Sequence, residues 1–410
     1  MTRILHTSDW HLGVSLEAAS RDADHALFFE WLAGVLTERA VDVLVVAGDI
    51  FDQSAPSSES QRMYYRFLHR VAQTSVRQVV VIGGNHDSAA RLEAPSDLLG
   101  AFDVHVVGGM PAADDSLDRY LVPIRNVAGV VESVILAIPY VHEYRVGVRA
   151  AFSANVDLGA LLHQGFASLY TRVADHAHAR HGRVPLVATG HMACIGSERG
   201  DAPLDIHLIG TLGALPPSIF DPRIQYVALG HIHRGFRVGG SRAWYSGTPI
   251  PLNLKEAQTQ RRVLLIDTQA DEGAEPVVES VAVPMFRQIH ELRGTPEEVV
   301  GALRGLTWST PLPPLVQIVA RVPSYQPGLG QDFAKATPPG AQIVKVTQER
   351  EVGEAQAEPA PPVSLSQLAP EEVFLRLCRA RGEPVDEALL TAFHSLLGDY
   401  ALAENTGGRP

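Results

Sequence analysis

Five short and almost continuously apolar runs constrain the fold of this chain more than any other feature. They are "TRILHTS", "VDVLVVA", "VRQVVVI", "VPLVAT" and "IQYVAL". Such β-rich runs are typical of strands buried on both faces, as in layered α/β domains. Between the first two lies a helix candidate in which Leu27, Trp31, Val35 and Leu36 recur at helical spacing. The sequence therefore predicts an α/β domain over residues 1–267.

Beyond residue 267 the composition shifts. The polar and acidic stretch 268–280 is typical of a turn or a linker, and 351–362 has the composition of a linker. The segment between them predicts a small α+β unit over 285–350, and the tail carries two helix candidates over 363–404. The second helix candidate carries an apolar stripe, formed by Val385, Leu389, Phe393, Leu396, Leu397 and Tyr400. Such a stripe needs either a partner or its own domain to cover it, and we favour a partner.

Composition narrows the class of protein. A chain of 410 residues exceeds one ordinary core, which predicts two or three domains. The two cysteines, Cys194 and Cys378, are too few and too far apart for a disulfide framework or a thiolate zinc site. The chain has neither a membrane-span pattern nor a signal-peptide pattern, so we expect a cytoplasmic protein. The net charge of −12 disfavours a protein that coats nucleic acid unaided, but permits an enzyme that holds phosphates through cations.

Polar residues of the kind that bind metals follow each apolar run. The motifs are "SDWHLG", "AGDIFD", "GGNHD", "TGHM" and "GHIH", which contain Asp9, His11, Asp49, Asn85, His86, Asp87, His191, His231 and His233. In layered α/β sheets, ligands bind at the carboxyl ends of strands. Carboxylate, amide and imidazole donors suit Mn²⁺, Fe or Zn²⁺. Seven candidate ligands are too many for one centre, but suit two metals about 4 Å apart that share a carboxylate.

Each motif has a plainer interpretation when taken alone. A single Asp or His at a strand end is more often a cap or a turn residue than a ligand. Asp87 is equally compatible with a turn, and Asp52 either caps the following segment or supports the site, so it stays outside the ligand set. The segment "WYSGTPIPL" either approaches the substrate or forms an ordinary turn. The joint occurrence of the motifs in order favours a metal site.

The ordered set DxH, GD, GNHD, GH and GHxH resembles the calcineurin-like metallophosphoesterase superfamily. The fuller forms "TSDWHLG", "AGDIFDQSAPS", "GGNHDS", "ALGHIHR" and "SGTPIPL" resemble a narrower family, the bacterial SbcD nuclease subunits. The resemblance implies a four-layer sandwich of two mixed β-sheets flanked by helices. It also implies that 285–350 is a capping, DNA-binding domain and that 363–404 binds an SbcC-type coiled-coil ATPase.

The resemblance also implies roles for the candidate residues. One metal would be bound by Asp9, His11, Asp49 and His233; the other would be bound by Asp49, Asn85, His191 and His231. Asp49 would bridge the two ions, for which the resemblance favours Mn²⁺. His86 would act as the acid that protonates the leaving oxygen, with Asp87 orienting its ring.

The function that the resemblance implies is that of a metal-dependent DNA nuclease in recombination, replication and repair. It would act as a 3′→5′ exonuclease on double strands and as an endonuclease on single strands and hairpins. A dimer of nuclease subunits within a heterotetramer with the ATPase is implied too. One alternative is a phosphatase or phosphodiesterase for a small molecule or phosphoprotein, which would share every metal motif. Another is a non-catalytic scaffold, which would have no use for His86.

Overall fold

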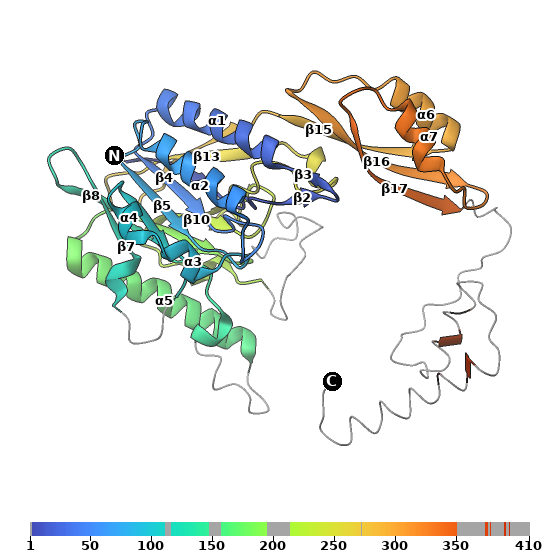
Figure 1. The fold of residues 1–410 in the computed structure, drawn as a ribbon. Coiled ribbons are helices and arrows are strands. Elements are labelled where there is room, and N and C mark those ends of the chain that lie inside the picture. The colour runs from blue at the N-terminus through green and yellow to red at the C-terminus, as the bar shows by residue number, and fades with distance from the viewer. Residues whose placement is uncertain are drawn as a thin grey trace. The chain divides into compact units, whose positions relative to one another are not determined.

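The structure is a computed structural model, and it describes residues 2–110, 116–146, 157–194, 214–271 and 273–350, with six residues of the tail. The chain divides into two units, Met1–Arg350 and Glu351–Pro410, which are described separately. The first unit contains two large sheets, their covering helices and a smaller sheet that lies toward its C-terminal end (Figure 1).

The first large sheet is six-stranded and mixed. Its central strands are parallel and carry the runs predicted from the sequence, whereas β13 and β14 pair antiparallel at one side. The strand order is β14 (Val277–Ala282), β13 (Arg262–Asp267), β1 (Arg3–Thr7), β4 (Val43–Ala47), β5 (Gln78–Ile82) and β6 (Val104–Val107).

The second large sheet is also six-stranded and mixed. Strands β12, β10, β9 and β8 are parallel, and β11 and β7 are antiparallel edge strands. The order is β11 (Phe236–Arg237), β12 (Ala243–Tyr245), β10 (Ile224–Gly230), β9 (Leu186–His191), β8 (Val131–Leu136) and β7 (Leu121–Arg125).

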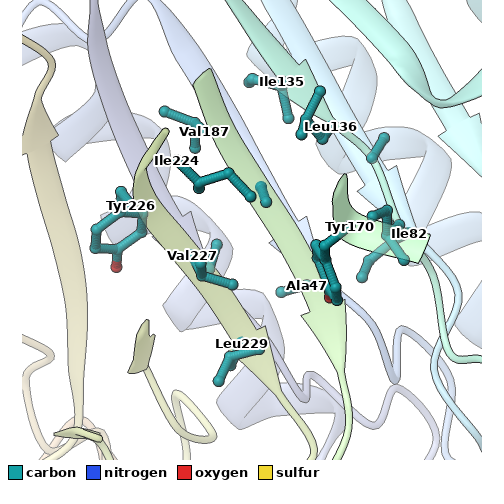
Figure 2. Packing of buried hydrophobic residues seen from close by; sticks show 14 of the residues in the cluster. Ala47, Ile82, Ile135, Leu136, Tyr170, Val187, Ile224, Tyr226, Val227 and Leu229 are labelled. Carbon is teal, nitrogen blue, oxygen red and sulfur yellow. The ribbon is translucent and has the colours of Figure 1, made fainter. Parts of the chain in front are cut away.

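The alternation of side chains along buried strands builds two separate apolar layers from one sequence run. In β4, Val43, Val45 and Ala47 belong to the core between the two sheets, whereas Leu44 and Val46 belong to the core under the helices. The intersheet core also receives Val187 and Val227 and other residues of the second sheet (Figure 2). A central strand that contacts both cores must therefore be apolar on both faces.

Helices cover the outer faces of both sheets (Figure 1). Phe28 of α1 (Asp22–Glu38) and Phe67 of α2 (Ser58–Val71) pack with the outer side of the first sheet. Tyr170 of α5 (Leu158–His181) packs with the second sheet. The short helices are α3 (Ala89–Glu93), α4 (Ser96–Gly100) and the 3-10 turns η1 (Leu117–Tyr120), η2 (Glu143–Val146), η4 (Pro217–Ile219) and η5 (Glu256–Gln258). The four-layer sandwich expected from the sequence is confirmed.

A third sheet forms the small unit at 285–350, which we call the cap. Its three strands are parallel and alternate with two helices, in the order β15 (Arg287–Gly294), α6 (Pro296–Arg304), β16 (Leu312–Val322), α7 (Leu329–Ala336) and β17 (Gln342–Arg350). The two helices pack on one face of the sheet, with Leu303 and Phe333 in its core. Leu315, on the other face, packs against Leu16 of the hairpin formed by β2 (Ser15–Leu16) and β3 (Ala19–Ser20).

The linker predicted over 268–280 is wrong for its last four residues. Residues 277–280 begin β14, which pairs with β13 along six residues of each strand. All six residues of β14 are exposed or half-buried, because it lies at the edge of the sheet. In β14, whose sequence is VVESVA, a glutamate and a serine interrupt the apolar residues, so it lacks the continuous apolar run from which the buried strands were predicted.

In the tail, Phe374, Leu375, Cys378, Leu389, Leu390 and Phe393 are described, and all six are helical. The rings of Phe374 and Phe393 stack with centroids 4.1 Å apart, so the two predicted helix segments contact each other. Val385, Leu396, Leu397 and Tyr400 of the apolar stripe lie outside the described residues. Among the described parts of the chain, no helix combines the length and the apolar character that a membrane crossing requires.

Candidate metal centre

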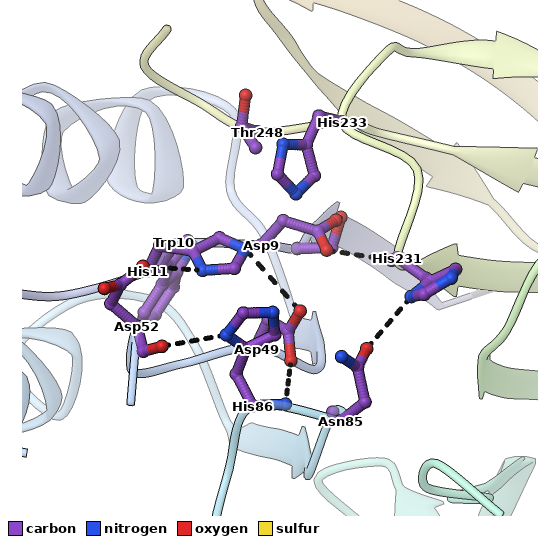
Figure 3. Close-up of polar contacts among 12 residues, drawn as sticks. Asp9, Trp10, His11, Asp49, Asp52, Asn85, His86, His231, His233 and Thr248 are labelled. Carbon is purple, nitrogen blue, oxygen red and sulfur yellow. Dashed lines mark hydrogen bonds and ion pairs between the residues drawn. The ribbon is translucent and has the colours of Figure 1, made fainter. Parts of the chain in front are cut away.

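The carboxyl ends of five strands converge at one place between the two large sheets (Figure 3). All seven side chains predicted as ligands belong to these strand ends. Asp9 and His11 follow β1, Asp49 follows β4, and Asn85 follows β5. His191 ends β9, and His231 and His233 follow β10. The structure therefore brings strand ends of both sheets together, although the residues are up to 224 positions apart.

Asp49 lies at the middle of this cluster. Its Oδ2 is 3.5 Å from Nε2 of His11 and 3.3 Å from Nε2 of His191, on two different sides of the site. Its Oδ1 accepts a hydrogen bond of 2.9 Å from the backbone N–H of His86. One carboxylate oxygen thus anchors the loop, and the other faces both groups of imidazoles.

A second group of donors surrounds Asn85. Its Oδ1 lies 3.0 Å from Nε2 of His191 and 2.9 Å from Nδ1 of His231. The ring of His191 is also held from behind, where Nδ1 donates to the backbone carbonyl of Ala47 at 2.9 Å. That bond places a proton on Nδ1 and turns Nε2 toward Asn85 and Asp49.

The backbone at this cluster is strained. Asp9, His11, Asp49 and His231 have φ values of 53°, 48°, 50° and 95°, in the left-handed region that non-glycine residues rarely adopt. Among the described residues only three other non-glycine positions have positive φ. Strain of this kind persists where surrounding structure enforces it, which is typical of functional sites.

Two glycines make the close approach of the loops possible. A Cβ on Gly48, whose φ is +87°, would overlap the ring of His191. A Cβ on Gly84 would overlap the carboxylate and the backbone nitrogen of Asp49. The glycines that precede these motifs therefore serve the tight packing that the sequence predicts.

The charges and burial of the cluster shift the pKa values of its histidines in opposite directions. Burial alone would raise the pKa of Asp49, but the positive charges of His191 and His11 outweigh it and hold that pKa well below its usual range. Burial opposes the charged form of His191, yet Asp49 and Asp9 raise its pKa to about 9. Burial and the charge of His191 lower the pKa of His231 to about 4, so His231 is a neutral donor at pH 7.

The residues present fit divalent cations. Donor atoms of Asp9, His11 and His233 lie within 4.8 Å of one another, and so do those of Asp9, Asp49 and His191. The side chain of His11 is 3% exposed, and neither ring nitrogen has a hydrogen-bond partner among the described residues. The His11 imidazole lies 3.4 and 3.5 Å from two carboxylates. Burying its ring nitrogens without hydrogen bonds is energetically unfavourable, and coordination of a cation would offset this loss.

The comparisons with known proteins agree with this geometry. The family model for calcineurin-like phosphoesterases matches residues 2–235, which is more than half of the chain. The chain is 37% identical over 306 residues to SbcD, a subunit of the SbcCD nuclease, from Rhodobacter capsulatus, covering 73% of this chain and 75% of that protein. The chain belongs to the SbcD family of calcineurin-like phosphoesterases.

Other SbcD relatives extend the similarity along the chain. The SbcD protein of Escherichia coli is 31% identical over 411 residues, which covers 97% of this chain and 99% of that protein. The SbcD protein of Bacillus subtilis is 28% identical over 284 residues, or 66% of this chain and 68% of that protein. A second model, described as the type 5 capsule protein repressor C-terminal domain, matches residues 285–381. The identification as a nuclease subunit of this family, a metal-dependent phosphodiesterase, is confirmed.

His86, the predicted acid of this SbcD chain, lies at the edge of the cluster. Its Nδ1 donates to the backbone carbonyl of Asp52 at 2.8 Å, and its ring meets that of His11 edge-to-face with centroids 4.9 Å apart. This hydrogen bond places a proton on Nδ1 of His86.

The direct contact expected between Asp87 and the His86 ring is absent from the hydrogen bonds of the described residues. The carboxylate of Asp87 instead accepts from the backbone N–H groups of Gly84, Ile50 and Phe51, at 2.9, 3.1 and 3.0 Å. Burial, together with the charge of Asp49, raises the pKa of Asp87 to about 6. Asp87 therefore organises two ligand loops, and the Asp52 carbonyl holds the His86 ring.

Sequence reasoning leaves the role of Asp52 open and does not identify Glu256. The Asp52 carboxylate lies 3.4 Å from Nδ1 of His11, so it supports a candidate ligand from outside the cluster. Glu256 accepts a hydrogen bond from Nδ1 of His233 at 3.0 Å. The only signal for Glu256 in the sequence is that a carboxylate closely follows the "SGTPIPL" segment, which is compatible with either a turn or a substrate contact.

Proposed function

We propose that the chain is the nuclease subunit of an SbcCD-type complex, which hydrolyses phosphodiester bonds of DNA with two divalent cations, most simply Mn²⁺. The activities proposed are 3′→5′ exonuclease on double-stranded ends and endonuclease on single strands and hairpins. The observation that carries the proposal is the convergence of six other donor residues around Asp49, whose Oδ2 lies 3.5 Å from His11 and 3.3 Å from His191. The proposed setting is cytoplasmic DNA recombination, replication and repair.

The proposed ligand sets share Asp49. Asp9, His11 and His233 would complete one site, and Asn85, His191 and His231 would complete the other. Cations bound there supply Lewis-acid polarisation of the phosphoryl group and a lowered pKa for attacking water. The protein's own contribution is to fix donors that lie at five separate strand ends, with strained backbone at four of the seven residues.

His86 would move the proton. With Nδ1 held by the Asp52 carbonyl at 2.8 Å, its Nε2 can protonate the oxygen that leaves phosphorus. Asp87 would act on the reaction only through the loops, since its carboxylate binds three backbone N–H groups. Asp52 would act through His11, whose Nδ1 it faces at 3.4 Å.

The proposed partners are DNA and an SbcC-type coiled-coil ATPase, with two nuclease subunits in a heterotetramer. Support comes from the names of the SbcD relatives and from the match to the Escherichia coli protein, which covers 97% of the chain. We assign the proposed DNA-binding cap to 285–350 and the proposed ATPase-binding helices to 363–404. A small-molecule phosphatase would share the metal motifs but has no need of these two regions, so it is not favoured.

One experiment tests both activity and substrate. Purified protein with Mn²⁺ is incubated with hairpin DNA, linear duplex and a small aryl phosphodiester, with and without an SbcC-type ATPase. We expect DNA cleavage that the ATPase and ATP stimulate. Turnover of only the small ester, in both conditions, would instead favour the phosphatase alternative. A chain that lacks residues 363–404 should keep ester hydrolysis and lose the stimulation.

A further inference from the structure

The carboxylate of Glu256 contacts the candidate ligand His233. It begins the 3-10 turn Glu256–Gln258 on the loop that runs past the metal cluster, and its side chain is 14% exposed. Its Oε1 accepts from Nδ1 of His233 at 3.0 Å and from Nδ2 of Asn253 at 2.6 Å. Its Oε2 accepts from the backbone N–H of Leu252 at 2.9 Å.

Arg261 and Thr248 both link Glu256 to the backbone of His233. Arg261 places Nη1 4.0 Å from Oε2 of Glu256 and donates from the same nitrogen to the backbone carbonyl of His233 at 2.8 Å. The backbone N–H of Thr248 donates to that same carbonyl at 3.1 Å. The carboxylate and the backbone of His233 therefore belong to one hydrogen-bonded unit, which leaves the imidazole little freedom to turn.

We propose that Glu256 is a positioning residue, which keeps the proton of His233 on Nδ1 and presents the Nε2 lone pair to the cation bound by Asp9 and His11. A carboxylate can only accept, so the ring nitrogen that faces it carries hydrogen. Figure 3 shows the other ring nitrogen directed toward Asp9 and His11, whose donor atoms lie within 4.8 Å of that of His233. A histidine binds a metal through an unprotonated nitrogen, and an acceptor behind the ring fixes which one that is. The inference rests on the proposed metal-dependent function.

The donors around the side chain of residue 256 require a glutamate at this position. Both of its oxygens face donors, His233 and Asn253 on one side and Leu252 on the other. Glutamine has one oxygen and one NH₂ group, so it would either point a donor at His233 Nδ1 or leave the Leu252 N–H facing another donor. The first outcome moves the proton of His233 to Nε2 and blocks the metal-facing nitrogen. Glu256→Gln therefore removes the requirement for hydrogen on Nδ1 of His233, with almost no change in volume.

The test begins with the metal-free protein labelled with ¹⁵N-histidine, at pH 8.5. The His233 signals are assigned by their loss in His233→Gln. In the wild-type chain we expect hydrogen on Nδ1 and a lone pair on Nε2. In Glu256→Gln we expect this pattern to reverse or to become a mixture. Hydrogen on Nε2 in the wild-type chain overturns the proposal, whatever any variant does.

Cation binding provides the second measurement. Mn²⁺ binding is measured by calorimetry. We expect Glu256→Gln to weaken it by about 10- to 100-fold. The apparent Mn²⁺ requirement for DNA cleavage should rise equally, and excess Mn²⁺ should restore most of the rate. The matched control is Glu279→Gln, on the exposed edge strand β14, where the carboxylate pairs with Arg39 and its side chain is 51% exposed. Equal Mn²⁺ affinity in Glu256→Gln and wild type contradicts the proposal. If instead the wild-type chain binds no Mn²⁺, the proposed function fails while the tautomer measurement still stands.

Discussion

Nε2 of His191 lies 3.3 Å from Oδ2 of Asp49, and the histidine is fully buried. Despite the burial that opposes it, the carboxylates of Asp49 and Asp9 raise the pKa of His191 to about 9. In the metal-free protein at pH 7.5, His191 therefore carries a proton that a bound cation must displace. We predict that Mn²⁺ binding releases this proton, so that affinity increases with pH by up to about tenfold per unit below pH 9.

Calorimetry can count this proton. The heat of Mn²⁺ binding is measured at pH 7.5 in two buffers that differ in ionisation enthalpy, and the difference gives the number of protons released. The sign follows from the raised pKa: His191 is protonated below about 9 when free, and deprotonated when it is a ligand. Identical heats in both buffers would refute the assignment of His191 as a ligand that titrates on binding.

For His86 we predict separation of catalysis from metal binding. His86→Ala should lower the rate of DNA cleavage by about 100- to 10,000-fold, because proton transfer to the leaving oxygen is lost. Its affinity for Mn²⁺ should stay close to that of the wild-type chain, since its ring bonds to the Asp52 carbonyl outside the ligand set. His69→Ala, at an exposed position of α2, is the matched control for both assays. Undiminished cleavage by His86→Ala would remove this histidine from the mechanism.

Much of the scaffold and the candidate ligand set was predictable because both follow from strand burial. Runs such as "VDVLVVA" are apolar on both faces, and β4 uses both of its faces in two cores. Once such runs form parallel strands, their carboxyl ends meet, and the polar residues that follow them meet as well. Asp9 and Asp49 follow neighbouring parallel strands of one sheet, whereas His191 ends β9 of the other sheet, so its approach also depends on how the two sheets pack.

What the sequence did not reveal depends on contacts that have no periodic pattern. The Asp87 carboxylate binds the loop at Ile50, 37 residues earlier, and not the adjacent His86 ring. Glu256 reaches His233 across 23 residues through a 3-10 turn. Spacing along a chain does not specify which atom a carboxylate at a loop will face. The edge strand β14 was not predicted for a related reason, since an exposed strand needs no continuous apolar run.

Gly84 provides a test of how tightly the loops must pack. Gly84→Ala adds one methyl group that would overlap Asp49, so we expect Asp49 to shift. Mn²⁺ affinity should fall by about tenfold or more, since both proposed sites use that carboxylate. Gly34→Ala is the control, because its added methyl group, within α1, meets no atom within 4 Å. It should leave Mn²⁺ affinity unchanged and stabilise the fold by about 0.5–1 kcal/mol. Equal Mn²⁺ affinity in the two variants would show that the loop tolerates the added group.

Asp24 joins the cap to the sandwich. Its side chain is 1% exposed and lies 2.8 Å from Nη2 of Arg21 and 3.0 Å from Nε of Arg287, the first residue of β15. Removing the carboxylate leaves the buried guanidinium of Arg21 and the guanidinium of Arg287, whose side chain is 10% exposed, without their counter-charge. We predict that Asp24→Ala lowers the free energy of unfolding in urea by about 3–5 kcal/mol. Asp332→Ala removes an exposed ion pair to Lys335 within the cap and should cost at most about 1 kcal/mol. If the two variants unfold at the same urea concentration, the Asp24 pairs do not hold the cap in place.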